Sequence, residues 1–202
     1  MSRDISEAQD LESRWPKDGD RLFVASAWVQ DAHVARDPGE RFYRMPMGYK
    51  RAGDLLIEQA AADIVDRSNV IYAALFCYRQ SIELFLKKLI ADFGNGKVYS
   101  PKNTHELNRL WERFMCIVTE RDNSKTDGLS VVQRLVAEMH ETDQKSDGFR
   151  FPTDSNDLPF AFGDRGIDLA NVREVMQGAT NFFECAYLHF SHQDDETKGP
   201  DP

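Results

Sequence analysis

The sequence predicts an all-α fold, an up-and-down bundle of four to five helices with an extra helical segment at the N-terminus. Two observations lead to this prediction. Apolar residues recur at steps of three and four along several stretches, which is the spacing of one face of an α-helix. Period-2 alternation, the pattern of a half-buried strand, is scarce. We therefore expect antiparallel helices around one core.

Three regions are expected along the chain. Residues 1–40 form an N-terminal extension, 41–190 a helical bundle and 191–202 a disordered acidic tail. The extension carries an apolar group over 22–29 that suggests a short helix, followed by a connection marked by Asp37-Pro38-Gly39. The tail contains no apolar residue, so nothing drives it into a core.

The first two helices of the bundle are predicted over 49–65 and 69–93 from the spacing of their apolar residues. The second has the strongest pattern, with seven apolar positions separated by three or four residues, namely Ile71, Leu75, Tyr78, Ile82, Phe85, Leu89 and Phe93. It is expected to be the central core helix. Its end is expected at Gly94-Asn95-Gly96, because these residues accept positive φ.

Capping residues place the remaining helices. Asn103, followed three residues later by Glu106, is predicted to cap a helix over 103–119. Ser130, followed by Gln133, is predicted to cap another over 130–142. Asp168 caps the last helix, which is expected to end at Phe190. Residues 143–167 are rich in Gly and Pro and are expected to form one long irregular connection.

Composition limits the compartment and the chemistry. No apolar run approaches the roughly 20 residues of a membrane-spanning helix, and the charged start resembles neither a signal nor a transit peptide, so the cytoplasm is expected. Cys77, Cys116 and Cys185 are odd in number and flanked by apolar residues, as reduced core thiols are. Of the five His residues, His189 and His192 are three apart and could ligate a metal on one helix face, but a solvated pair is the simpler interpretation. We expect no disulfide, no metal and no cofactor.

The charge is unevenly distributed. The net charge is −9, and residues 141–202 carry 5 Lys and Arg against 13 Asp and Glu, a balance of −8. This balance argues against the uniformly basic surface of a non-specific nucleic-acid binder. Local basic strips remain, and a solvated charged face is their simpler interpretation. One such strip comprises Arg36, Arg41, Arg44, Lys50 and Arg51.

Arg79, Glu83 and Lys87 lie four residues apart on the flank of the central helix. The simpler interpretation is an intrahelical charge ladder, in which each pair contributes a few tenths of a kcal/mol. The alternative is a partly desolvated group that organises a site or an interface, because charges beside an apolar stripe lose part of their hydration.

Three stretches together resemble the HEPN family of helical proteins. They are Tyr78-Arg79-Gln80-Ser81-Ile82-Glu83-Leu84-Phe85-Leu86-Lys87, then Thr104-His105-Glu106-Leu107, then Phe149-Arg150-Phe151-Pro152. Their order is that of a long helix with an Arg, Ile-Glu and Leu-Lys signature, a His that opens the next helix, and an Arg-Phe-Pro turn before the last helix. The likeness covers about residues 49–190.

The resemblance implies a helical bundle that usually pairs into a homodimer. Members of the family act as ribonuclease toxins, in phage defence, or as partners of nucleotidyltransferase-like proteins. The catalytic members carry an Arg, four to six residues, and then a His. Arg134 and His140 are the one pair with this spacing here, and Leu135 stands where a polar residue is typical. On a continuous helix these two side chains point roughly 120° apart.

Two functional hypotheses follow from the resemblance, and a purely structural charged core is a third interpretation. The first is a non-catalytic dimeric module that binds a nucleotide, RNA or a protein partner. The surface implied for it comprises Arg79, Glu83, Lys87, His105 and Arg150. The second is a metal-independent ribonuclease in which Arg134 stabilises charge on the phosphate and His140 acts as general acid or base at the dimer seam.

Arg150 has two interpretations of its own. The aromatic residues on either side of it, Phe149 and Phe151, could serve only to hold the long connection on the bundle, with Pro152 keeping Phe151 extended. Alternatively, Arg150 bonds to Glu83 or to carbonyl groups at a helix C-terminus.

Overall fold

The computed structural model divides the chain into two units, Met1–Ala35 and Arg36–Pro202. In the first unit, residues 15–23 contain no helix, and Leu22 and Phe23 are exposed. Most of the helix expected over 22–29 lies outside the described residues. The structure describes residues 15–23, 32, 34–94, 105–121, 128–154, 156–160 and 166–198.

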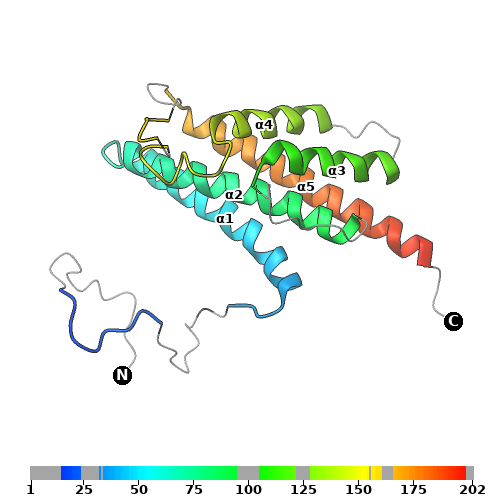
Figure 1. Cartoon of the computed structure of the whole chain (residues 1–202), viewed down its shortest axis with the longest axis horizontal. Coiled ribbons are helices and arrows are strands. Elements are labelled where there is room, and N and C mark those ends of the chain that lie inside the picture. Colours follow the sequence, from blue (N-terminus) through cyan, green and yellow to red (C-terminus); the bar gives the residue numbers. More distant parts are fainter. Residues whose placement is uncertain are drawn as a thin grey trace. The chain divides into compact units, whose positions relative to one another are not determined.

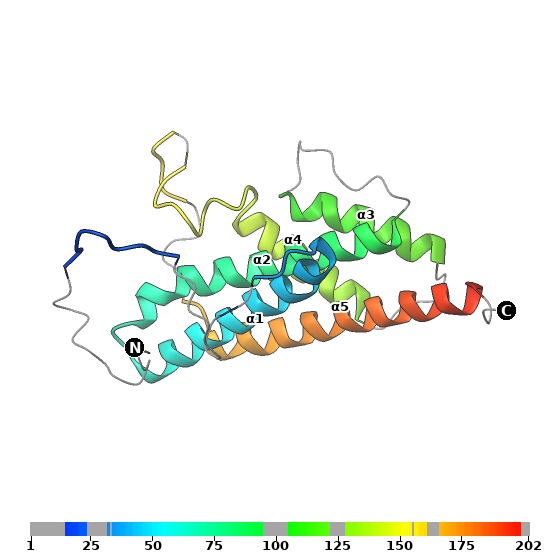
Figure 2. The ribbon, with the colours of Figure 1, turned by 90° about the horizontal axis from the view of Figure 1, so that it is seen from below.

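Five helices form the second unit, and its described residues contain no β-strand, which confirms the all-α bundle (Figure 1). Helix α2 packs against α1, α3 and α5, while α4 packs against α3 and α5 (Figure 2). In the part of the chain that is described, no helix has the length and apolar character needed to cross a membrane. The helices are α1 (Pro38–Ala62), α2 (Arg67–Phe93), α3 (Leu107–Arg121), α4 (Leu129–Thr142) and α5 (Leu169–Lys198).

Helix α1 begins eleven residues earlier than the sequence pattern predicts, at Pro38 instead of residue 49. The Asp37 carboxylate accepts a hydrogen bond of 2.7 Å from the Glu40 backbone N–H, and Pro38 occupies the first turn, so Asp-Pro-Gly is a helix start here. At the other end α1 stops at Ala62, and the apolar side chains of Ile64 and Val65 are exposed. The expected bounds of 49–65 are therefore wrong at both ends.

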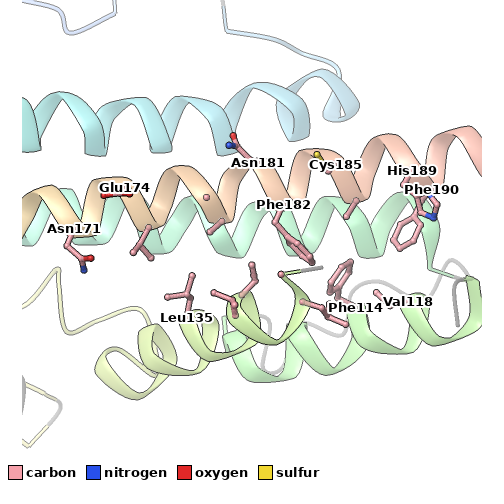
Figure 3. Close-up of a pocket in the computed structure, with 18 residues that line it drawn as sticks. Phe114, Val118, Leu135, Asn171, Glu174, Asn181, Phe182, Cys185, His189 and Phe190 are labelled. Carbon is pink, nitrogen blue, oxygen red and sulfur yellow. The ribbon is translucent and has the colours of Figure 1, made fainter. Parts of the chain in front are cut away.

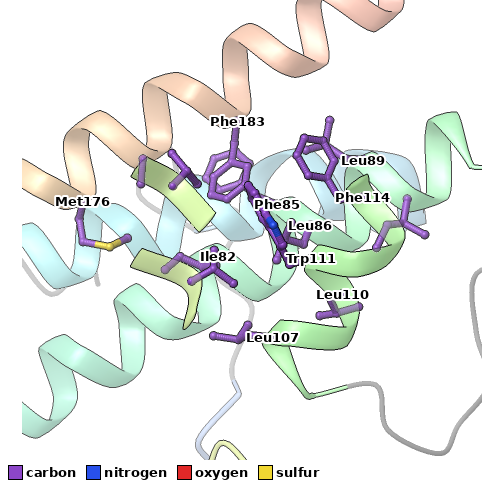
Figure 4. Packing of buried hydrophobic residues seen from close by; sticks show 14 of the residues in the cluster. Ile82, Phe85, Leu86, Leu89, Leu107, Leu110, Trp111, Phe114, Met176 and Phe183 are labelled. Atoms are coloured by element: carbon purple, nitrogen blue, oxygen red, sulfur yellow. The ribbon is translucent and has the colours of Figure 1, made fainter. Parts of the chain in front are cut away.

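Helix α2 is the central core helix, as predicted, and its apolar face is buried against α3 and α5 (Figure 4). The ring of Phe85 stacks on that of Phe183 with centroids 5.5 Å apart. The helix ends at Phe93 with Gly94 as its C-cap, as predicted, and Gly94 has a φ of −83°. Glycine is required there by close approach, since a Cβ would lie 2.5 Å from the Ile90 carbonyl oxygen.

The starts of α3 and α4 differ from the predicted caps. Helix α3 begins at Leu107, so His105 precedes it, and the predicted cap Asn103 lies outside the described residues. Helix α4 is capped by Gly128 rather than Ser130, because the Val132 N–H donates to the Gly128 carbonyl at 2.9 Å. Gly128 has a φ of +87°, a conformation that glycine adopts without strain.

Helix α5 begins as predicted, with the Asp168 carboxylate accepting from the Asn171 N–H at 3.1 Å. It continues to Lys198 instead of ending at Phe190, so the disordered tail expected over 191–202 is wrong for residues 191–198. An ion pair of 2.6 Å between Arg121 of α3 and Asp194 holds this extra length. In the connection over 143–167, the described residues form no helix, as predicted.

Candidate functional site

The predicted ladder on α2 is a buried ion network. Four-residue steps bring Arg79 and Lys87 to Glu83, whose carboxylate accepts 2.8 Å from Arg79 Nη1 and 2.6 Å from Lys87 Nζ. Arg79 is 0% exposed and Glu83 is 2% exposed. Arg79 and Glu83 therefore lie inside the core. The prediction that they form part of a ligand-binding surface is wrong for these two residues.

Two neighbouring elements complete the shell around Arg79. Its Nη2 donates to the His105 carbonyl just before α3 at 2.7 Å, and its Nε donates to the Asp143 carbonyl just after α4 at 3.0 Å. The His105 ring adds a 2.9 Å contact from Nδ1 to Glu83 Oε1 while remaining 62% exposed. The structure therefore brings His105 together with Arg79 and Glu83.

Asp143 is the member of this network that the sequence analysis missed. Its Oδ2 lies 3.4 Å from Arg79 Nε, and its Oδ1 accepts from the backbone N–H groups of Asp147 and Gly148. Asp143 thus joins Arg79 to the turn that follows α4. The sequence offers one indication that a further acceptor is needed. Arg79 has five N–H donors, more than the Glu83 carboxylate alone can accept.

Arg150 lies on the same turn but bonds elsewhere. Its Nε donates to the Ser146 carbonyl, and its guanidinium lies 5.8 Å from the Phe76 ring centroid on α2. Arg150 therefore bonds neither to Glu83, which is bonded by other groups, nor to a carbonyl at a helix C-terminus, because Ser146 lies three residues beyond the Asp143 C-cap of α4. Gln80 also donates to the Ser146 hydroxyl at 2.8 Å. Together these contacts hold the turn on α2.

The network is a buried ion cluster in which Glu83 is fully bonded, while Asp143 Oδ2 has the 3.4 Å ion pair with Arg79 but no hydrogen-bond partner among the described residues. Burial raises the pKa of Glu83, but the hydrogen bonds and charges of Lys87 and Arg79 outweigh it and hold the pKa below its ordinary value of 4.5. Both oxygens of the ionised carboxylate already accept hydrogen bonds. Glu83 is therefore not available as a general base, and the cluster positions α2, the start of α3 and the end of α4.

Arg134 and His140 do not meet within one chain. Helix α4 runs unbroken from Leu129 to Thr142, so the two side chains keep the angular separation expected on a continuous helix. Arg134 is exposed. The Nδ1 atom of His140 is buried and has no hydrogen-bond partner among the described residues. Burial lowers the pKa of His140, assisted by the charge of Arg79 and opposed by that of Glu106.

A second buried network joins α1, α2 and α5. Lys50 donates to the Asp54 carboxylate at 2.7 Å and to the Gln177 side-chain oxygen, and the Tyr78 hydroxyl donates to Asp54 at 2.9 Å. Burial, then the hydrogen bond to Asp54, raises the pKa of Tyr78. Lys50 therefore does not belong to a solvated basic face, and the interpretation of that strip is wrong for this residue.

A groove of about 800 Å³ lies between α3, α4 and α5 (Figure 3). Its lining is mostly apolar, with Glu174 as the one carboxylate and with no Lys or Arg among the described residues that line it. Cys185 is exposed in this groove, and Cys116 is exposed outside it, so the expectation of core thiols is wrong for both. The lining residues are Phe114, Val118, Gly128, Leu129, Val131, Val132, Leu135, Asn171, Glu174, Val175, Gly178, Ala179, Asn181, Phe182, Cys185, Ala186, His189 and Phe190.

No family model, no curated protein and no solved structure matches this chain. In the described part of the chain, no group of three or more His, Cys, Asp or Glu residues is arranged to hold a metal ion.

Proposed function

We propose that this chain is a non-catalytic helical binding module that takes a protein partner in the groove between α3, α4 and α5. The observation that carries the proposal is the groove itself, an apolar hollow of about 800 Å³ on a bundle whose ionised core groups are already paired. Covering the apolar side chains that line such a hollow removes them from water, which is favourable. The HEPN resemblance adds the expectation that two copies of the module pair into a homodimer.

The charge of the groove favours a protein over RNA or a nucleotide. Phosphate groups bind where Lys, Arg or free backbone N–H groups converge. The described lining of the groove contains Glu174 and no Lys or Arg. Phosphate oxygens would meet a carboxylate there, so we favour an apolar protein segment as the partner.

A metal-independent ribonuclease is the second candidate, and one observation favours it. Unlike Arg79 and Glu83, the guanidinium of Arg134 and the Nδ1 atom of His140 have no internal partner among the described residues. Across a dimer seam, Arg134 of one copy could stabilise phosphate charge while His140 of the other moves the proton of the 2′-hydroxyl.

One experiment separates the two candidates. The purified chain and its His140→Ala variant are each incubated with single-stranded RNA in the presence of EDTA. Light scattering measures the mass of each protein in solution. The binding module predicts intact RNA for both proteins and the mass of a dimer. Cleavage by the original chain that is lost in His140→Ala would replace the proposal by the ribonuclease. A monomeric mass would remove the dimer from it.

A further inference from the structure

A long strip of α5 lines the groove. The residues of α5 that line it begin at Asn171 and end at Phe190, and they recur on one side of the helix. At 1.5 Å per residue this strip is about 28 Å long. Figure 3 shows α5 along one wall of the groove and side chains of α3 and α4, including Phe114 and Leu135, along the other. The hollow therefore has the length of a helix of some five turns.

Gly178 lies midway along this strip and has no internal reason to be glycine. A Cβ at this position would meet nothing within 4 Å, and glycine in a helix interior costs about 1 kcal/mol relative to alanine. Gly53 differs, because a Cβ there would collide with Tyr78. The bare backbone at Gly178 leaves room for close approach by something outside the described bundle.

Carboxylates gather at one end of the groove. A second hollow of about 350 Å³ adjoins it and shares Leu135, Asn171 and Val175 with its lining. Glu138 and Asp168 line this second hollow and Glu174 lines the first, while the described linings of both contain no Lys or Arg. A ligand that lies along α5 and reaches Asn171 would therefore be close to the carboxylates of Glu174 in the first hollow and of Glu138 and Asp168 in the second.

We propose that the groove is the docking site for one amphipathic helix of a partner protein, a helix with an apolar face and with Lys or Arg at the edge that meets Glu138, Asp168 and Glu174. The inference rests on the proposed binding module and specifies its partner. A helix of about 18 residues has the length of the strip. Its apolar face covers Val175, Gly178 and Phe182, in the manner of helix-in-groove recognition.

The probe is a fluorescent 18-residue model helix with Leu at positions i, i+3, i+4 and i+7 and Lys elsewhere. A second peptide with Glu in place of Lys has the same apolar face and the opposite charge. Binding of each peptide to the full chain is measured by fluorescence anisotropy. We expect the Leu/Lys helix to bind at least tenfold more tightly than the Leu/Glu helix. Equal binding, or tighter binding of the Leu/Glu helix, would overturn the inference.

Two glycine variants locate the binding. Gly178→Leu adds a side chain at a position in the groove where a Cβ meets nothing within 4 Å, and it should weaken binding of the Leu/Lys helix at least tenfold while leaving the fold intact. Gly48→Leu is the matched control, because Gly48 is also an exposed helical glycine whose Cβ would meet nothing within 4 Å, and it does not line the groove. It should bind like the original chain. Equal loss in both variants, or in neither, would overturn the assignment to the groove.

Thiol chemistry gives an independent readout in the same sample. The Leu/Lys helix should slow alkylation of Cys185, which lines the groove, and leave Cys116 unchanged as the internal reference. Protection of neither thiol would contradict docking in the groove, as would equal protection of both. Dissociation of a dimer by Gly178→Leu would identify a second copy as the occupant and would also overturn the inference. RNA cleavage by the chain would instead count against the proposed function.

Discussion

Arg79 and Asp143, 64 residues apart in the sequence, are joined twice in the core of the bundle. Arg79 Nε donates to the Asp143 carbonyl at 3.0 Å and lies 3.4 Å from the Asp143 carboxylate. Both side chains are 0% exposed. Since a buried charge is costly unless its partners stay in place, this pair holds the end of α4 against the middle of α2.

The first prediction concerns the stability that depends on Arg79. In Arg79→Ala, Asp143 loses its cationic partner and Glu83 loses one of the two cations bonded to it, while all these groups stay buried. We expect the free energy of unfolding to fall by about 3–5 kcal/mol. Urea denaturation followed by circular dichroism measures this change.

The matched control for Arg79 is Arg109→Ala. Arg109 pairs with Glu106 at 2.6 Å, but its side chain is 55% exposed. Exposed pairs contribute about 0–1 kcal/mol, so this variant should unfold within that range of the original chain. If Arg79→Ala cost no more than Arg109→Ala, the buried network would not stabilise the fold.

The second prediction is a loss of stability in acid that depends on Glu83. Its pKa is below 4.5 in the folded chain, because Lys87 and Arg79 outweigh the effect of burial. The ionised form therefore stabilises the folded state above about pH 4.5, and this contribution is lost as the pH falls through the folded-state pKa. Between pH 5 and pH 3 the original chain should lose more stability than Glu83→Gln. Parallel declines in urea denaturation would contradict this assignment.

The third prediction has a different pH range and concerns His140. Burial, assisted by the charge of Arg79, lowers its pKa below 6.5, so the unfolded chain binds this proton more readily than the folded chain. Stability should fall as the pH drops from 7 to 5, and it should fall less in His140→Gln. An NMR titration of the His140 ring tests this directly. A pKa above 6.5 would show that the ring is not held neutral by its surroundings.

The sequence predicts most of the helices because their signal is local. Apolar residues at three- and four-residue steps locate α2 to within two residues of each end. The same rule fails at Ile64 and Val65, which continue the pattern of α1 although the helix has ended. Periodicity indicates which face is apolar, and it does not indicate where tertiary contacts stop supporting the helix.

The candidate site is less predictable because its partners are distant in the sequence. The pairs from Glu83 to Arg79 and Lys87 follow from four-residue spacing along one helix. Asp143 reaches Arg79 only because two helices and a turn bring them together, and no local pattern encodes that approach. The groove is likewise a property of three helices, so only its separate apolar stripes could be read from the sequence.

The fourth prediction compares two glycines of α1. A Cβ at Gly53 would lie 2.7 Å from the ring of Tyr78, which is 0% exposed and bonded to Asp54. A Cβ at Gly48 would meet nothing within 4 Å. Gly53→Ala should therefore be destabilising by overpacking, whereas Gly48→Ala should gain up to about 1 kcal/mol of helix propensity.

Thermal or urea unfolding of the two alanine variants measures the packing of α1 on α2. The variants should differ by about 2 kcal/mol, with Gly53→Ala the less stable. Equal stabilities would mean that Tyr78 moves away from α1 without cost.

The fifth prediction concerns the last turns of α5. Arg121 bonds to Asp194 at 2.6 Å and lies over the rings of Phe93 and Phe190, with its guanidinium 5.1 and 5.6 Å from their centroids. In Asp194→Ala we expect amide hydrogen exchange to become faster over residues 191–198, while global stability changes by less than about 1 kcal/mol because the pair is partly exposed. Asp195→Ala removes a neighbouring exposed carboxylate and is the control. Faster exchange in both variants would mean that negative charge in general, and not the pair with Arg121, stabilises the end of α5. Faster exchange in neither would mean that the contacts of Arg121 with the Phe93 and Phe190 rings are sufficient to hold it.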